Sequence, residues 1–519
     1  MYDLIIKNGR IIDGTGSPSY FADVAIKDGK IARIAKEIEG GDQIIDARGL
    51  VVTPGFIDSH SHSDSLLLKY PDQIEKIEQG ITTSIAGQCG TSPAPVSMEI
   101  DPATAEHIGD FGKSTDIYRT MGTFLNIAKD VPLGANMATF VGHSALRKAV
   151  MGCGDRAPSK EELERMKELL REGIEHGALG VSFGLIYTPS CYAKTDELIE
   201  LAKVAREYNA LVAAHIRQEG DFLIKSTEEF LTVIKTAGVR GILSHHKASG
   251  KENWGKVTHT LRMLEEANNE GYEVYCDVYP YNASHTSLSA TFIPREMRAT
   301  TNDGLAKLLA DPQARTRIRE FGMAKWGHDI SWVQITQCQA YPQYEGKLVS
   351  EIAKIHGKEV YETICDMIAD SKNICNACYF TMCEEDIKTV LAYPRAMICT
   401  DSGVAGASKV YHPRLRGTFP RVLGKYVHQC QVTSLPEMIR KMTSMPATVY
   451  GLKGKGLLVE GFDADLCIFD PNRIIDRAEY TDCSKRAEGL NYVLLGGQVV
   501  VENAVYNGKR PGRVLLRNK

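Results

Sequence analysis

The segment Val51-Val-Thr-Pro-Gly-Phe-Ile-Asp-Ser-His60-Ser-His62 places two histidines directly after an apolar run. Side chains alternate in direction along a strand, so residues two positions apart project from the same face. His60 and His62 therefore stand side by side at the end of a predicted buried strand. Paired imidazoles make a poor core and good metal ligands. The segment predicts half of a metal site, with the other ligands coming from elsewhere in the chain.

Seven further apolar segments of strand length follow, and helical patterns lie between many of them. The predicted strands are 51–58, 82–87, 137–142, 179–183, 211–214, 241–244, 273–278 and 395–400. Ser159 has the position of an N-cap before one of the helices. Strands that alternate with helices predict an α/β fold with a parallel sheet, and eight such strands close naturally into a (β/α)8 TIM barrel.

The two ends of the chain differ from its middle. Residues 1–53 and 451–519 contain short strands separated by turn residues, such as Asn8-Gly9, Asp28-Gly29 and Gly496-Gly497. We expect these ends to form one small β-sandwich beside a barrel spanning residues 54–450. The gap before the last predicted strand exceeds one crossover, which predicts an inserted subdomain at about 286–390.

The composition is that of an ordinary globular protein, with 519 residues, 43% hydrophobic residues and a net charge of −4. This balance gives no indication of nucleic acid or a membrane as a partner. We expect no signal peptide and no membrane span, because no window approaches the ~18 apolar residues that a span requires. The 13 cysteines lack a disulfide-scaffold spacing, which predicts buried free thiols and a cytoplasmic protein. The oligomeric state stays open.

Further candidate ligands end other predicted strands, and a barrel gathers these ends on one face. They are Cys89, His143, His215, His245 and Asp401. Taken alone, a buried cysteine is usually an inert thiol, and a buried histidine is usually a hydrogen-bonded core residue. His143 and His246 in particular have this structural explanation. The set of His60, His62, Cys89, His215, His245 and Asp401 is a stronger signal than any member, and it predicts one metal site.

Of the adjacent residues His245 and His246, only one can face the barrel mouth if the strand continues straight. We choose His245, because Lys247 then shares its side. Imidazole, thiolate and carboxylate ligands together favour zinc over magnesium or calcium. Zinc lowers the pKa of a bound water to about 7, so that the water can attack as hydroxide. Asp401 suits the general base that moves the proton of this water to a leaving nitrogen.

Several longer motifs are more specific than the single residues. They are Gly87-Gln-Cys-Gly-Thr-Ser-Pro-Ala-Pro95, Ala178-Leu-Gly-Val-Ser-Phe-Gly-Leu-Ile-Tyr-Thr-Pro189, Ser244-His-His-Lys-Ala-Ser-Gly250, Asp277-Val-Tyr-Pro-Tyr281 and His412-Pro-Arg-Leu-Arg-Gly-Thr-Phe-Pro-Arg421. With the opening segment, they resemble the amidohydrolase superfamily and, within it, the N-acyl-D-amino-acid deacylase (D-aminoacylase) family. The resemblance covers almost the whole chain.

This resemblance implies one tightly bound zinc and a weaker second metal position. The implied ligands are Cys89, His215 and His245 for the first position and His60, His62 and Asp401 for the second. Many superfamily members place a carboxylated lysine at the end of the fourth strand, but residues 180–187 contain no lysine. The thiolate of Cys89 can supply the missing anionic ligand. The absence of that lysine argues against hydantoinase or dihydroorotase chemistry.

The substrate implied by the resemblance is an N-acyl-D-amino acid, which is cleaved to a carboxylate and a D-amino acid. Tyr187, Lys247 and Arg414 match the family's positions for binding the substrate carboxylate, and a guanidinium fork fits a carboxylate bidentately. Arg416 and Arg421 are alternatives for this contact. Each residue also has an explanation without a substrate. Tyr187 could be a core tyrosine, and Arg414 could belong to a surface ion pair.

His285 stands where the family usually has a small hydroxyl residue. We therefore expect His285, together with His143, near the substrate, and an altered preference for the side chain or acyl group. Two other functions stay open from the sequence. One is a related hydrolase that acts on a cyclic amide or a dipeptide with a D-residue. The other is a non-catalytic assembly protein that keeps the barrel without metal.

Overall fold

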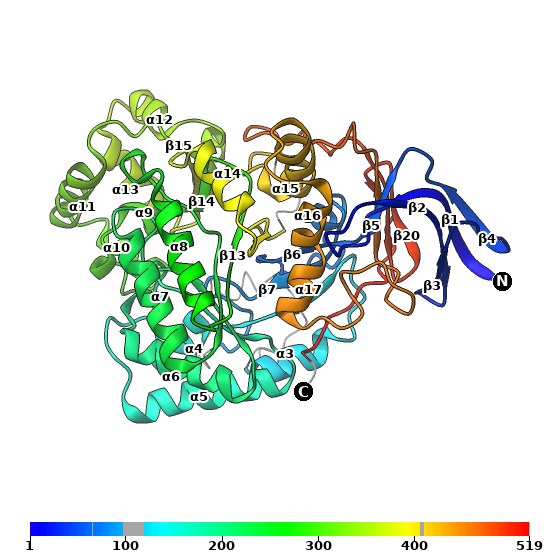
Figure 1. The fold of residues 1–519 in the computed structure, drawn as a ribbon. Helices are drawn as coiled ribbons and strands as arrows, with labels where there is room; N and C mark the ends of the chain where they lie inside the picture. Colours follow the sequence, from blue (N-terminus) through cyan, green and yellow to red (C-terminus); the bar gives the residue numbers. More distant parts are fainter. Residues whose placement is uncertain (65, 97–118, 405–408, 518–519) are drawn as a thin grey trace.

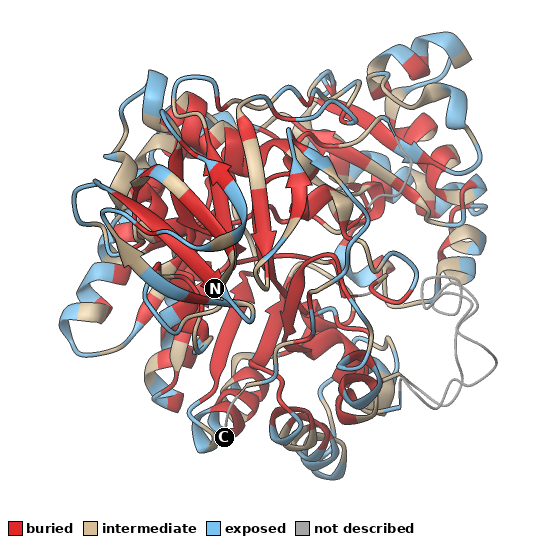
Figure 2. Ribbon diagram, turned by 90° about the vertical axis from the view of Figure 1, so that its right-hand side faces the viewer, coloured by how far each residue is buried: buried red, intermediate tan, exposed pale blue. Residues whose placement is uncertain are grey.

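The structure is a computed structural model that describes residues 1–64, 66–96, 119–404 and 409–517 (Figure 1). Its centre is a set of parallel strands at the positions predicted for a barrel. These strands are β6 (Phe56–Asp58), β7 (Ile81–Ala86), β8 (Asn136–Thr139) continued by β9 (Val141–Gly142), β10 (Gly180–Gly184), β11 (Leu211–His215), β12 (Arg240–Leu243), β13 (Val274–Val278) and β17 (Ala396–Ile398). β10 and β11 are buried along their whole length, as Figure 2 shows for the interior generally.

The barrel strands pair in two arcs, β6-β7-β8 and β17-β13-β12-β11-β10-β9. At one seam the amide of Ser59 donates to the carbonyl of Ile398 at 3.2 Å, which joins the first strand to the last. At the other seam the amide of Leu179 donates to the carbonyl of Thr139 at 2.9 Å. The two arcs therefore close, and the predicted (β/α)8 barrel is confirmed.

Amphipathic helices surround the barrel. They include α4 (His143–Met151), α5 (Lys160–Glu175), α6 (Thr195–Glu207), α7 (Leu223–Ala237), α8 (Lys256–Asn269), α14 (Glu384–Ala392) and α16 (Leu435–Met442). α5 begins at the predicted N-cap, where Ser159 Oγ accepts the Glu162 amide and the Glu162 carboxylate accepts the Ser159 amide. This capping box satisfies two amides that the first turn leaves unpaired. Leu170 and Ile174 of α5 then pack into the main apolar core.

The two chain ends form one β unit, on the right of Figure 1. Its nine strands are β1 (Tyr2–Ile11), β2 (Tyr20–Lys27), β3 (Lys30–Ala35), β4 (Gly41–Asp46), β5 (Val51–Pro54), β18 (Leu466–Phe469), β19 (Leu490–Leu495), β20 (Gln498–Glu502) and β21 (Val505–Tyr506). β5 pairs with β18, which links the two ends. Leu4 and Val24 share an apolar core with Leu466 and Leu494, so the unit depends on both ends.

The predicted first strand, 51–58, is in fact two strands. β5 belongs to the terminal sheet and β6 to the barrel, and the break falls after Pro54. A Cβ on Gly55 would lie 2.3 Å from the side chain of Thr82, so glycine permits the close approach of β7 there. The polypeptide thus changes sheets at Pro54 and Gly55, which a continuous apolar run does not reveal.

One predicted turn is wrong. Asn8 and Gly9 lie inside β1, where the register with β2 shifts, and Asn8 has a φ of 60°. The left-handed conformation therefore serves a β-bulge instead of a hairpin. The other two predicted turns, Asp28-Gly29 and Gly496-Gly497, do connect β2 to β3 and β19 to β20.

The segment between β13 and β17 contains the predicted insertion. It is built from β14 (Ser284–Ser287), α9 (Leu288–Phe292), α10 (Asn302–Leu308), α11 (Pro312–Trp326), β15 (Val333–Cys338), α12 (Val349–His356), α13 (Val360–Asp370) and β16 (Cys375–Tyr379). Phe292, Ile335 and Ile368 belong to an apolar core of its own. β14 brings His285 from this insertion towards the barrel.

All 13 cysteines are free, and most are buried. Among the residues that the structure describes, every helix is too short or too polar to cross a lipid bilayer.

Candidate metal centre

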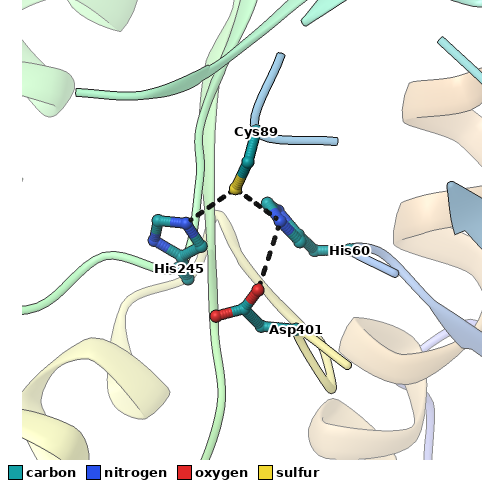
Figure 3. A group of neighbouring side chains, drawn as sticks. All are labelled: His60, Cys89, His245 and Asp401. Carbon is teal, nitrogen blue, oxygen red and sulfur yellow. Dashed lines mark hydrogen bonds and ion pairs between the residues drawn. The ribbon is translucent and has the colours of Figure 1, made fainter. Parts of the chain in front are cut away.

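The six predicted ligands meet at the carboxyl ends of the barrel strands. The sulfur of Cys89 lies 3.3 Å from Nε2 of His60, 3.5 Å from Nδ1 of His215 and 3.3 Å from Nε2 of His245. Figure 3 shows Cys89 above and between His60 and His245, with Asp401 below them and paired with His60. Side chains from three other strand ends therefore converge on the sulfur of Cys89.

Asp401 and His62 lie at the outer edge of this group. One carboxylate oxygen of Asp401 is 3.6 Å from Nε2 of His60 and 3.2 Å from Nε2 of His62. The side chain of His60 is fully buried, whereas that of His62 is 31% exposed. The ligand set therefore has a closed side at Cys89 and a side near His62 that is open to solvent.

Three of the six residues have a left-handed backbone, with φ of 51° at Cys89, 35° at His245 and 47° at Asp401. Such conformations are uncommon for residues other than glycine and cost on the order of 1 kcal/mol each. They turn the chain at the end of a strand, so the side chain points across the mouth of the barrel. Local hydrogen bonds hold these turns; for example, the His245 amide donates to the carboxylate of Asp277.

The loop that carries Cys89 packs directly on the end of β10. A Cβ on Gly184 would lie 1.8 Å from the carbonyl oxygen of Cys89. Gly90 faces the same strand, because its own Cβ would lie 2.8 Å from the amide nitrogen of Gly184. No side chain fits at position 184, so the cysteine loop occupies the end of the fourth barrel strand.

Burial controls the protonation of the centre. It raises the pKa of the Cys89 thiol well above its usual value, and the Asp401 carboxylate acts in the same direction. Burial lowers the pKa of His60 well below its usual range and that of His215 to about 3. The protein alone thus favours a neutral thiol at Cys89 and neutral imidazoles at His60 and His215, because the interior disfavours charge.

The donor set fits a divalent cation. A thiol has one proton and can donate one hydrogen bond, yet three imidazole nitrogens face the Cys89 sulfur. Nδ1 of His60 and Nε2 of His215 are buried without a hydrogen-bond partner among the described residues. Nitrogen and thiolate ligands around one point are the arrangement that zinc prefers.

A second group lies behind His245, and it includes a residue that the sequence did not reveal. Oε1 of Glu219 is 3.0 Å from Nδ1 of His245 and 2.5 Å from Nζ of Lys247. Lys247 Nζ is also 2.8 Å from His245 Nδ1 and donates to the His245 carbonyl at 2.7 Å. Although burial raises the pKa of Glu219, Lys247 and the two histidines hold it well below its usual range. In the sequence, Glu219 stands four residues after His215, and this spacing was the one feature that could have indicated its place beside the site.

His246 points the other way, with Nε2 2.8 Å from the hydroxyl of Thr260 on α8. The structure thus places His245 at the mouth and His246 against the helix layer.

Arg414 is the arginine that reaches the centre. Its side chain is buried, Nη1 donates to the second Asp401 oxygen at 2.7 Å, and Nη2 donates to the His285 carbonyl at 3.4 Å. Its guanidinium lies 4.7 Å from the ring centroid of Tyr279, a cation–π contact. Tyr279 was not singled out in the sequence, although it lies in the quoted motif after the seventh strand.

The two alternative arginines bind elsewhere. Arg416 pairs with Glu78 at 2.9 Å, and Arg421 pairs with Asp476 at 3.1 Å.

Tyr187 and His285 lie where the insertion meets the barrel. The ring of Tyr187 is 5.2 Å from that of His215, and its hydroxyl accepts from Thr286 of β14 at 3.2 Å. Nε2 of His285 is 2.8 Å from the hydroxyl of Thr336 on β15. The insertion therefore contributes side chains beside the predicted ligands.

The structure does not bring His143 to this group. Its Nε2 is 2.9 Å from Glu197, and its Nδ1 is 2.8 Å from the hydroxyl of Ser190. Arg147 donates to the same Glu197 carboxylate at 2.6 Å. Both ring nitrogens are thus occupied in a buried network, so His143 presents no free nitrogen to a substrate.

The comparisons with known proteins agree with this geometry. The amidohydrolase family matches residues 43–311 and 397–501, which leaves out most of the insertion. A D-aminoacylase from Alcaligenes xylosoxydans xylosoxydans is 34% identical over 99% of this chain and 98% of its own length. An N-acyl-D-glutamate deacylase from the same organism is 34% identical over 99% and 97%.

Solved structures show the same likeness. An N-acyl-D-glutamate deacylase from Bordetella bronchiseptica, solved with zinc and a phosphonate inhibitor, is 32% identical with a TM-score of 0.84, and each chain is covered completely. An L-hydantoinase from Arthrobacter aurescens, 17% identical with a TM-score of 0.57 and complete coverage of both chains, shares the fold.

Proposed function

The chain belongs to the amidohydrolase family, and on that basis we propose that it is a zinc-dependent N-acyl-D-amino-acid deacylase. It hydrolyses the linear amide to a carboxylate and a free D-amino acid. The observation that carries this proposal is the convergence of three imidazoles on the Cys89 sulfur. Full-length similarity to D-aminoacylase and N-acyl-D-glutamate deacylase supports the substrate class.

Cys89, His215 and His245 hold the tightly bound zinc, and His60, His62 and Asp401 form the weaker second position. When bound, zinc polarises the amide carbonyl and lowers the pKa of the attacking water. The burial of the three tight ligands keeps competing water out. The partial exposure of His62 gives the second position access to solvent.

Asp401 moves the proton of the reaction. It takes a proton from the attacking water and gives it to the nitrogen that leaves. Although burial raises its pKa, Arg414 and His245 hold it well below its usual range, so the group is an ionised carboxylate at neutral pH. The ion pair with Arg414 fixes one carboxylate oxygen and leaves the other facing the histidines.

Arg414 is the main anchor for the substrate carboxylate. Its Nε is buried without a partner among the described residues, so the guanidinium keeps a donor for a ligand. Lys247 already donates to Glu219 and to the His245 carbonyl, and a substrate must displace one of these contacts to reach it. Tyr187, whose ring lies beside that of His215, supplies a hydroxyl. His285 lies beside Arg414, where it influences the preference for the acyl group or side chain.

A panel of N-acetyl D- and L-amino acids, with zinc measured on the same sample, tests the function. We expect turnover of D-substrates only, and loss of turnover when a chelator removes the metal. Turnover of hydantoin or dihydroorotate, together with no turnover of any N-acetyl-D-amino acid, would show that the substrate is a cyclic amide. The close packing of Cys89 on Gly184 disfavours that alternative, because it excludes a lysine there.

A further inference from the structure

Lys76 lies below the metal centre and is fully buried. It comes from the short helix α1 (Ile74–Ile77), outside the barrel strands. Its ammonium donates to the Asp58 carboxylate at 2.9 Å, to the Thr400 hydroxyl at 2.6 Å and to the Ser402 carbonyl at 2.7 Å. The Ser402 hydroxyl lies 3.1 Å away as a fourth acceptor. One ammonium thus binds the first and last barrel strands together.

Asp58 completes the connection. One carboxylate oxygen accepts the Thr400 amide at 2.8 Å, and the other accepts the Thr400 hydroxyl at 2.6 Å. Asp58 ends β6, two residues before His60, and Thr400 directly precedes Asp401. The buried ion pair therefore lies beneath the seam whose two strand ends carry His60, His62 and Asp401.

The backbone at this seam needs external support. Asp401 is left-handed, with a φ of 47°, and the residues on both sides of it bind Lys76. A left-handed residue persists only where its surroundings determine its conformation. A buried ion pair is in general weak evidence for stability, because desolvation offsets the attraction between the charges. The Lys76–Asp58 pair is better explained by the geometry that it imposes.

We propose that Lys76 and Asp58 are positioning residues for the second metal position and for the proton-transfer carboxylate. They set the orientation of Asp401 relative to His60 and His62, and they leave the tight site of Cys89, His215 and His245 unaffected. The tight site is supported from other strands, with Glu219 behind His245. The effect on turnover rests on the proposed function, whereas the effect on metal binding does not.

The test compares metal titrations of three variants with those of the wild type. Lys76→Met alone would leave the Asp58 carboxylate buried without an opposite charge, so this single variant is not used. Lys76→Met/Asp58→Leu removes both charges at similar volume. Thr400→Val keeps the ion pair and removes its hydroxyl link to the last strand. Lys441→Met is the matched control, because Lys441 is also a buried lysine that donates to backbone carbonyls, at Leu391 and Tyr393 before β17.

We expect the double variant and Thr400→Val to keep one zinc per chain and to bind a second divalent ion at least about tenfold more weakly. With N-acetyl-D-amino acids, kcat should fall at least about 100-fold in the double variant while KM changes little. Lys441→Met should match the wild type in both measurements.

Second-ion affinity at the wild-type level in Thr400→Val, or in a folded double variant, would overturn the proposal. Loss of the first zinc from either variant would also overturn it, because the tight site would then depend on the pair. If the double variant does not fold, Thr400→Val decides alone. If the wild-type enzyme turns over none of the N-acyl-D-amino acids, the proposed function fails, and the metal titration still decides the role of Lys76.

Discussion

Nδ1 of His245 lies 3.0 Å from the carboxylate of Glu219, while Nε2 of the same ring lies 3.3 Å from the sulfur of Cys89. A carboxylate on the second nitrogen of a metal-binding histidine fixes the proton on that nitrogen and the lone pair on the other. Together with Lys247, which lies 2.8 Å from the same Nδ1, Glu219 therefore orients the His245 ring so that Nε2 faces Cys89. It also binds Lys247, so one carboxylate connects the proposed metal ligand to a predicted substrate contact.

We predict that Glu219→Gln weakens zinc binding about 10- to 100-fold, because an amide orients the imidazole less strongly than a carboxylate does. Competition with a chromophoric chelator measures the change. Glu229→Gln is a matched control, since the Glu229 carboxylate binds Arg217 and Thr195 instead of the candidate metal ligands. Equal zinc affinity in Glu219→Gln and Glu229→Gln would contradict the role of Glu219.

Cys89→Ala should lose the tightly bound zinc, because it removes the proposed sulfur ligand and the point on which the imidazoles converge. Metal analysis of the purified variant measures the loss, and turnover should disappear with it. Cys467→Ala provides the control, as Cys467 is an equally buried thiol in the terminal sheet. Full zinc content in Cys89→Ala would refute the assignment of the thiolate.

Asp401→Asn should keep zinc at the thiolate site and lower kcat by about three orders of magnitude, in line with the loss of a general base. An amide has nearly the shape of the carboxylate but cannot take the proton of the attacking water. Steady-state kinetics and metal content on one sample separate the two effects. Asp476→Asn removes a carboxylate from the Arg421 ion pair and should leave kcat unchanged. A nearly normal rate in Asp401→Asn would mean that another group moves the proton.

The sequence predicted the barrel and the convergence of its candidate ligands well because both follow local rules. Apolar runs of strand length identify β10 and β11, and polar residues directly after such runs identify His215 and His245. The parallel arrangement then brings these residues to one face without further information. The metal chemistry followed from residue type alone, since thiolate with imidazole is a specific combination.

The rest depends on contacts between distant segments, which a single sequence does not reveal. Glu219 and Lys76 are ordinary charged residues in the chain, and only the folded structure places one behind His245 and the other under Thr400. His143 satisfied the same rule as the histidines that converge on Cys89, but its ring turns towards Glu197. The position of a residue at a strand end predicts proximity to the site, not the direction of its side chain.

Lys441 gives a prediction about pH that is independent of the metal centre. It is buried on α16, and burial lowers its pKa from 10.5 to about 8. Below the lower value, the lysine is protonated in the folded and the unfolded protein. Between the two values, the unfolded chain keeps a proton that the folded protein has released, so the free energy of unfolding rises with pH.

The rise in the wild type is at most about 3 kcal/mol, from a pKa difference of about 2.5. Lys441→Met lacks this titration, so its free energy of unfolding relative to the wild type should fall as the pH increases from about 7.5 to about 9.5. Urea unfolding of both proteins across this interval measures the difference, and other titrating groups cancel because both proteins contain them. A constant difference would show that Lys441 keeps its proton in the folded protein, held by the carbonyls of Leu391 and Tyr393.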